Sequence, residues 1–271
     1  MKVEAPATLD EALACLQAAP LVPLAGGTDL LVHWPGNLEA KAGHYVDLWA
    51  LDELRGIRRD AEGLTLGALA TYWDAIRDSR IREEFPILVQ AARQVGAIQI
   101  QSRGTWAGNV VNASPAADGV PVLMALDAVV VLASASRRRE VPLDAFYTGY
   151  RTTVRRADEL VVAVRLPDRG NAVQTFVKVG SRRAQAIAKV GLALARSEAG
   201  WRVVAASVAP TVVRCRTVEA ALDAGDAFAA PEDLLPLLRE DVTPIDDLRS
   251  TARYREMVLA RVLWHAIAEA A

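Results

Sequence analysis

The first fifty residues alternate between helical and strand-like spacing of apolar positions. The segment "TLDEALACLQAA" opens with Thr8 and places Glu11 three residues later, a capping-box pattern that predicts a short amphipathic helix. The apolar runs "LVPLAGG" and "HYVDL" then predict two strands, the first of which ends in a pair of glycines. We therefore expect a small α/β unit over about residues 1–53.

A second unit is predicted over residues 54–168. Apolar and polar residues alternate on both sides of Glu62–Gly63, which predicts a β-hairpin. Pro86 stands where a helix would have its first turn. The predicted elements are helices at 71–79, 84–95 and 120–126 and strands at 127–134 and 159–167.

The pattern changes after Pro167. Three strands are predicted, with a tight turn at Ala199–Gly200, and two helical stretches follow, the second over residues 246–270. Strands followed by helices indicate an α+β unit. We place the boundary in "PDRGN", near residues 168–171, so that the predicted domains are 1–168 and 169–271.

Composition narrows the class of protein. Of 271 residues, 52% are hydrophobic and 24% charged, which is typical of a globular protein with a substantial core. No apolar run approaches the roughly 18 residues that cross a bilayer, so membrane insertion is not expected. The start, "MKVEAPATLDEAL", lacks a signal-peptide core, so we expect a cytoplasmic protein.

The net charge and the positions of the cysteines and histidines argue against nucleic-acid-binding and metal-binding proteins. A net charge of −2 argues against a nucleic-acid partner. The basic run Arg137–Arg139 is expected to be a solvated hairpin connection, with a partner-docking patch as the alternative. Cys15 and Cys215 are too far apart for a disulfide framework, and the three histidines lack zinc-type spacing, so no metal site is expected.

The glycine pair Gly26–Gly27 has two interpretations. Glycines expose main-chain N–H groups and carry no Cβ, so the pair could surround a phosphate, and the Thr28 hydroxyl could donate to it. Alternatively, the glycines form only a turn between strand and helix. The stretch is neither a Walker A loop nor a three-glycine dinucleotide motif.

Residues 104–126, "GTWAGNVVNASPAADGVPVLMAL", are expected to include a long irregular segment between two helices. Long loops without structure are uncommon unless they serve a function. Their amide, hydroxyl and carboxylate groups suit a polyhydroxylated ligand with a phosphate bridge. A structural loop held by its own Asn and Ser side chains is the alternative.

Five motifs in order make the sequence recognisable: "AGGTDLL", "TWAGNVVNASPAADGVPVLMAL", "FYTGYRTT", "DELVVAVRLP" and "KVGSRRAQAIAKV". Together they resemble the FAD-binding medium subunit of molybdenum hydroxylases, a family that includes carbon monoxide dehydrogenase and the flavin segment of xanthine dehydrogenase. The segments "VAPTVVRCRTVEAAL" and "YREMVLARVLWHAI" are similar to the family's C-terminal domain. The resemblance thus covers nearly the whole chain.

The resemblance implies an α+β fold: a vanillyl-alcohol-oxidase-type (PCMH-type) FAD-binding domain of two α/β subdomains, about 1–53 and 54–168, and a small α+β C-terminal domain. It also implies a set of FAD-binding residues and no catalytic proton-transfer residue. The implied residues are Pro23, Leu24, Ala25, Gly26, Gly27, Thr28, Asp29, Leu30, Thr105, Trp106, Ala107, Gly108, Asn109, Ser114, Asp118, Val161 and Lys178.

Four site residues have other interpretations or depart from the family pattern. Trp106 and Ala107 stand where the family often has Ile and Gly, and alanine leaves less backbone freedom. Asp118 could instead cap the following helix, or do both. Lys178 could be a solvated lysine on an edge strand. Gln185 and Ala186 replace acidic residues of some members, so the handling of the flavin edge is not carried over.

The resemblance further implies an electron-transfer subunit of an oxidoreductase. Two distant cysteines cannot supply the four ligands of an iron–sulfur cluster. The resemblance implies a small subunit with 2Fe-2S clusters and a large molybdopterin subunit as partners, in a dimer of heterotrimers, with FAD in this chain passing electrons to an external acceptor. The alternatives are a self-contained flavin oxidase or reductase of the same fold and a flavin-free scaffold subunit.

Overall fold

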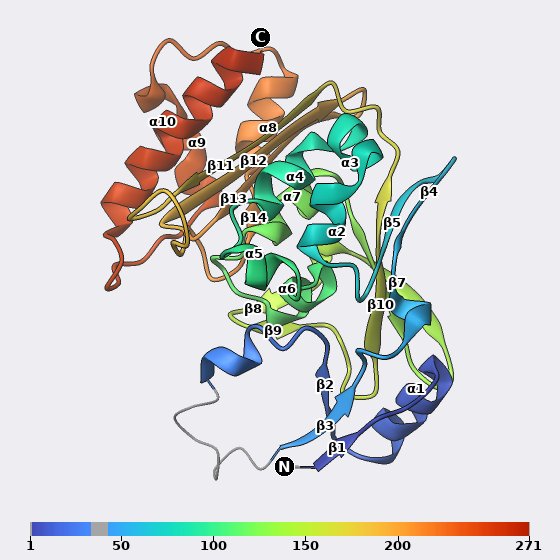
Figure 1. Cartoon of the computed structure of the whole chain (residues 1–271). Helices are drawn as coiled ribbons and strands as arrows, with labels where there is room; N and C mark the ends of the chain where they lie inside the picture. Colours follow the sequence, from blue (N-terminus) through green and yellow to red (C-terminus); the bar gives the residue numbers. More distant parts are fainter. Residues whose placement is uncertain (1, 34–42, 271) are drawn as a thin grey trace.

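The computed structural model describes residues 2–33 and 43–270. Figure 1 shows a small N-terminal sheet with α1 at one end of the molecule, a central group of short helices beside an antiparallel sheet, and a second sheet covered by the C-terminal helices at the other end. The helix-rich centre therefore lies between the two terminal parts of the chain.

The N-terminal unit is a parallel sheet of three strands in the order β1–β3–β2. Its elements are β1 (Lys2–Glu4), α1 (Leu9–Ala18), β2 (Val22–Leu24), the 3-10 turn η1 (Leu30–His33) and β3 (His44–Asp47). The Thr8 hydroxyl accepts from the Glu11 N–H at 3.2 Å, which confirms the predicted helix start. The Glu11 carboxylate reaches back to the Ala7 N–H, one residue before the cap.

The second sheet is antiparallel, in the order β4–β5–β10–β6–β7. Asp60 pairs with Gly63, so the predicted hairpin is confirmed. A register shift interrupts the pairing of β10 with β6 between Val161 and Ala163. The strands are β4 (Ile57–Asp60), β5 (Gly63–Gly67), β6 (Val129–Ala133), β7 (Arg138–Pro142) and β10 (Leu160–Pro167), and a separate short pair is β8 (Tyr147–Gly149) and β9 (Thr152–Thr153).

The basic run follows the prediction only in part. Arg137 lies in the connection between β6 and β7, and Arg138 is exposed at the start of β7. Arg139, however, is not merely solvated, because its guanidinium pairs with the Glu159 carboxylate at 2.7 Å. The hairpin connection is thus confirmed, but its third arginine stabilises the fold.

Short helices fill the region around this sheet. They are η2 (Asp52–Leu54), α2 (Tyr72–Arg77), α3 (Ser79–Glu84), α4 (Pro86–Ala92), α5 (Ile98–Gln101), α6 (Trp106–Asn112), α7 (Gly119–Ala125) and η3 (Leu143–Ala145). The expected long irregular stretch is therefore wrong, because α6 begins two residues into it. Its Gly and Asn content favours a loop, but Trp106 is fully buried against Tyr72, with ring centroids 4.7 Å apart, and tertiary packing overrides the local preference.

The C-terminal sheet has the order β11–β12–β13–β14, all antiparallel. Its elements are β11 (Val173–Val179), β12 (Val190–Ser197), β13 (Gly200–Ala206), β14 (Val213–Arg214), α8 (Arg216–Asp223), η4 (Pro231–Leu234), α9 (Leu235–Asp241) and α10 (Ala252–Ala270). The last helix begins later than predicted. The Asp247 carboxylate accepts the N–H groups of Arg249 and Ser250, which fixes a turn just before the helix.

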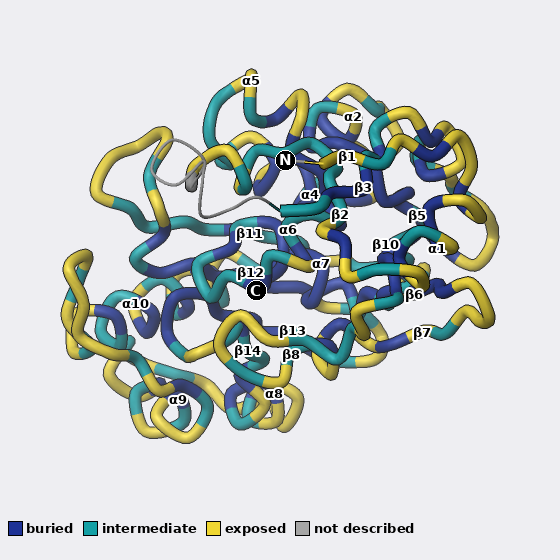
Figure 2. Tube along the Cα trace, turned by 90° about the horizontal axis from the view of Figure 1, so that it is seen from below, coloured by how far each residue is buried: buried dark blue, intermediate teal, exposed yellow. Residues whose placement is uncertain are grey.

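The C-terminal sheet is buried on both faces, because consecutive residues of a strand point to opposite sides. Ala193 and Ala195 belong to the large core shared with α4 and α7, whereas Leu192 and Leu194 belong to a second core beneath α8 and α10. Figure 2 shows the tube buried through the centre around α7 and β12 and exposed mainly in the outer turns. The sheet therefore joins the two cores.

Candidate functional site

The glycine loop follows β2 and is half-buried. Gly27 has a φ of +74°, which strains any residue with a side chain. A Cβ on Gly26 would lie 1.8 Å from the Arg103 carbonyl oxygen, so the two main chains touch. The fold itself therefore requires glycine at both positions, Gly27 for its backbone conformation and Gly26 for the close approach of Arg103. This agrees with the turn interpretation and is compatible with a ligand.

The main-chain N–H groups of residues 26–29 are the groups of this loop that could bind a ligand. Within the described part of the chain, none of them donates a hydrogen bond. Main-chain N–H groups that lack partners favour an anion, because they otherwise lose hydrogen bonds on partial burial. The loop thus offers four neighbouring donors.

The second predicted segment lies directly against this loop. Besides the Gly26–Arg103 contact, the Asn112 side-chain amide donates to the Asp29 carboxylate at 3.1 Å. The structure therefore brings the two glycine-containing segments together, as a ligand that binds both would require.

Several residues of the second segment hold the local structure. Thr105 Oγ1 accepts from the Gly108 N–H at 3.0 Å and starts α6. Asn109 Oδ1 accepts from the Gly119 N–H at 3.2 Å and joins α6 to α7. Ser114 Oγ accepts from the Ala116 N–H at 3.3 Å. The alternative of a segment held by its own Asn and Ser side chains is therefore supported for Asn109 and Ser114.

Trp106 and Ala107 are buried, so their side chains belong to the core rather than to an open cleft. The Trp106 indole N–H and the Tyr72 hydroxyl are both buried without a partner in the described residues. A Cβ on Gly119 would lie 3.1 Å from the Tyr72 hydroxyl oxygen, so this hydroxyl is next to the start of α7. The Trp106 side chain, which differs from the residue often found there in the family, thus fills the core.

Asp118 and Lys178 form the second part of the site. Lys178 Nζ lies 2.6 Å from Asp118 Oδ2 and 3.0 Å from the Gln94 carbonyl oxygen, and the two side chains are only 7% and 13% exposed. Lys178 is therefore not a solvated edge-strand lysine. The Asp118 side chain makes no capping hydrogen bond to α7, so the capping interpretation is wrong; Asn109 accepts the Gly119 N–H instead.

The pair is electrostatically unusual. Burial raises the pKa of Asp118 to about 6, and Lys178 opposes that rise only in part. Burial also raises the pKa of the Tyr72 hydroxyl, and the Asp118 charge adds to the rise. Asp118 Oδ1 has no hydrogen-bond donor among the described residues. At neutral pH the pair therefore presents a carboxylate oxygen available to a donor.

Val161 lies on β10, the strand against which α6 packs, and is buried. Sequence reasoning missed Arg103, Tyr72 and Gln94 as neighbours of the site. A signal existed only for Arg103, which immediately precedes Gly104 in "SRGTW".

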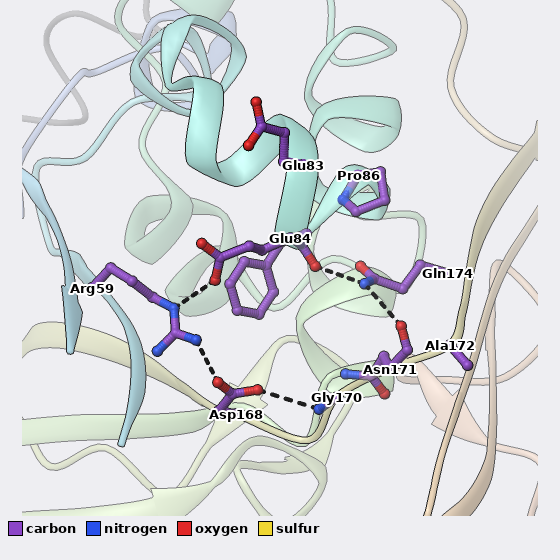
Figure 3. Close-up of a pocket in the computed structure, with 10 residues that line it drawn as sticks. Arg59, Glu83, Glu84, Pro86, Asp168, Gly170, Asn171, Ala172 and Gln174 are labelled. Carbon is purple, nitrogen blue, oxygen red and sulfur yellow. Dashed lines mark hydrogen bonds and ion pairs between the residues drawn. The ribbon is translucent and has the colours of Figure 1, made fainter. Parts of the chain in front are cut away.

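A polar cavity of about 500 Å³ lies at another place, between α3 and the segment before β11 (Figure 3). Arg59 projects into it and pairs with Glu84 at 2.7 Å and with Asp168. None of the predicted site residues lines this cavity. Its one guanidinium is already neutralised, so the cavity holds no free charge for an anion.

Two negative findings hold for residues 2–33 and 43–270. No group of three or more His, Cys, Asp or Glu side chains is arranged to hold a metal ion. No helix is both long enough and apolar enough to cross a membrane.

Comparison with known proteins identifies the family. Residues 1–169 match the family described as "FAD binding domain in molybdopterin dehydrogenase", and residues 175–270 match "CO dehydrogenase flavoprotein C-terminal domain". The xanthine dehydrogenase FAD-binding subunit of Escherichia coli O157:H7 is 30% identical, over 97% of this chain and 94% of that one. The nicotinate dehydrogenase FAD-subunit of Eubacterium barkeri is 36% identical over 69% of this chain and 65% of its own length.

The fold agrees with a solved relative. Carbon monoxide dehydrogenase from Hydrogenophaga pseudoflava contains a chain that is 28% identical and superimposes with a TM-score of 0.91, covering 100% of this chain and 96% of that one. The predicted flavin-domain fold with an α+β C-terminal part is thereby confirmed. This chain therefore belongs to the FAD-binding subunits of the molybdopterin dehydrogenases, a family of oxidoreductase subunits.

Proposed function

We propose that this chain holds FAD between the loop of residues 26–29, the segment 104–109 and the Asp118–Lys178 pair. The observation that carries the proposal is the row of undonated N–H groups at residues 26–29, in contact with the second segment through Gly26. Such a row suits a pyrophosphate. The remaining predicted residues, Pro23 through Ala25, Leu30, Ser114 and Val161, would support or border the cofactor.

The other groups suit the rest of FAD. Asp118 Oδ1 can accept a hydrogen bond from a cofactor hydroxyl while Oδ2 keeps Lys178. Lys178 supplies a buried positive charge that favours an electron-rich ring edge. The Trp106 side chain occupies the core and not the ligand space, so the unusual residue at that position is compatible with FAD.

FAD, once bound, accepts and gives electrons, while the protein supplies binding, orientation and electrostatics. We assign no proton-transfer residue to this chain. The proposed role is electron transfer from 2Fe-2S clusters of a small partner subunit to FAD and then to an external acceptor, with molybdopterin in a large subunit. The proposed assembly is a cytoplasmic dimer of heterotrimers.

The test is to tag the chain in its native host, purify it gently and assay FAD, iron and molybdenum. FAD with about four irons and one molybdenum per chain is the expected result. FAD without metals would favour a self-contained flavin oxidase or reductase. A folded protein without either would favour a flavin-free scaffold and contradict the proposal.

A further inference from the structure

Arg103 carries a positive charge without a described counter-charge. Its guanidinium lies over the Trp49 ring, 3.7 Å from the centroid, and the residue is exposed. Arg55 lies over the same ring at 4.8 Å, but its guanidinium also pairs with Asp52 at 3.3 Å. Within residues 2–33 and 43–270, no carboxylate or hydrogen-bond acceptor engages the Arg103 side chain.

Arg103 also touches the glycine loop through its main chain. Its carbonyl oxygen occupies the place that a Cβ on Gly26 would take. The Arg103 side chain therefore starts beside the free N–H groups of residues 26–29. Exposed charges interact within a screening length of about 8 Å at physiological ionic strength, and an arginine side chain attached beside Gly26 can come within that range of an anion on the loop.

The loop itself cannot supply such a charge. Residues 24–31, "LAGGTDLL", contain one ionisable side chain, Asp29, and it is negative. A pyrophosphate on this loop would therefore lie near a like charge unless a cation from another segment offset it. Arg103 is suitably placed, and the flat indole of Trp49 holds a guanidinium better than an ammonium because of stacking.

We propose that Arg103, positioned on Trp49, is the electrostatic partner of the FAD pyrophosphate and a determinant of selectivity for phosphate-bearing flavins. This inference rests on the proposed function, because it presupposes FAD on the loop. Arg103 is a positioning and binding residue and takes no part in electron transfer.

The experiment measures FAD affinity by flavin fluorescence, using the full chain at low and at high sodium chloride. Arg103→Gln is expected to weaken FAD binding roughly tenfold at low salt and to reduce the salt dependence. Arg55→Gln is the matched control on the same ring and should change affinity less than about twofold. Inorganic pyrophosphate should compete with FAD less effectively in Arg103→Gln than in the wild-type chain. Competition by riboflavin, which carries no phosphate, should be the same in both.

Arg103→Lys separates charge from stacking. It keeps the charge without the flat guanidinium, so it should retain the salt dependence and lose less affinity than Arg103→Gln. Unchanged FAD affinity and salt dependence in Arg103→Gln would overturn the proposal. Equal losses for FAD and riboflavin would also overturn it, because they indicate a structural role. No FAD binding by the wild-type chain would instead contradict the proposed function.

Discussion

Two buried carboxylates of this chain behave in opposite ways. Glu159, 1% exposed, accepts four hydrogen bonds from Arg139 and Arg156, and its pKa falls to about 2, chiefly because of Arg139. Asp118, 13% exposed, accepts one hydrogen bond from Lys178, and burial raises its pKa to about 6.

At Glu159 the hydrogen bonds from arginine outweigh the effect of burial, whereas at Asp118 burial outweighs the single partner Lys178. A carboxylate has about four acceptor positions, and those of Glu159 are filled by the protein. At Asp118 a single ion pair with Lys178 offsets part of the cost of desolvation, and Oδ1 has no donor among the described residues. The comparison indicates that Glu159 stabilises the fold, and it supports the proposal that Asp118 accepts a hydrogen bond from FAD.

The largest effect is expected from Glu159→Gln. Removing the charge leaves the Arg139 guanidinium without its main partner, so unfolding free energy should fall by about 3 kcal/mol, measured by urea denaturation. Asp158→Asn is the control, since Asp158 is about half exposed and 3.8 Å from Arg156, and it should cost less than about 0.5 kcal/mol. A stable Glu159→Gln with impaired FAD binding would reverse the assigned roles.

Asp118→Asn should have a smaller effect, and on the ligand rather than the fold. Loss of a charged acceptor should weaken FAD binding about tenfold to a hundredfold, measured by fluorescence titration. Unfolding free energy should change less than in Glu159→Gln, because removal of a desolvated charge offsets the loss of the Lys178 pair. Glu84→Gln, at the separate cavity, serves as the control. Stoichiometric FAD in the purified Asp118→Asn protein would refute its role.

The pH dependence of FAD affinity and of stability also separates the two carboxylates, and it is the smallest of the expected effects. FAD binding to a carboxylate should weaken as pH falls below about 6, by at most tenfold per unit, and the profile should be flat in Asp118→Asn. Because its folded pKa is raised, Asp118 adds stability that is present at low pH and lost as pH rises through about 6.

The contribution of Glu159 to stability changes with pH in the opposite direction. Its folded pKa is lowered, so its contribution is present above its ordinary value of 4.5 and is lost as pH falls toward about 2. The stability gap between wild type and Glu159→Gln should therefore stay constant from pH 7 to 5, while FAD affinity declines. A gap that closes over that range would show that Glu159 titrates like Asp118.

Local signals in the sequence were sufficient for much of the fold. Thr8 starts its helix as predicted, the helix predicted from residue 71 follows the Thr71 cap, and Gly63 marks the hairpin. These features depend on hydrogen bonds within a few residues, so sequence alone reveals them. The position of α6 was missed, because it depends on the burial of Trp106 against Tyr72, thirty-four positions away in the chain.

The sequence offered a candidate set of site residues but not the geometry that joins them. The motifs indicate Gly26, Asp118 and Lys178, but not that Lys178 would pair with a carboxylate 60 residues earlier. Nor could they show that the main chain of Arg103 would touch Gly26. Such contacts arise from packing between distant segments, and no local pattern encodes them. The domain boundary near 168–171 and the FAD contacts of the individual residues stay predictions.

The C-terminal sheet, with an apolar surface on each face, has a consequence for how this protein can be inherited. Ala193 and Ala195 complete the core around α4 and α7, while β11 carries the lysine that pairs with Asp118. A gene encoding only residues 1–168 would leave that core uncovered and the carboxylate without its cation. On the proposed function, the FAD site would therefore pass from one enzyme to another only together with the C-terminal sheet that supplies Lys178.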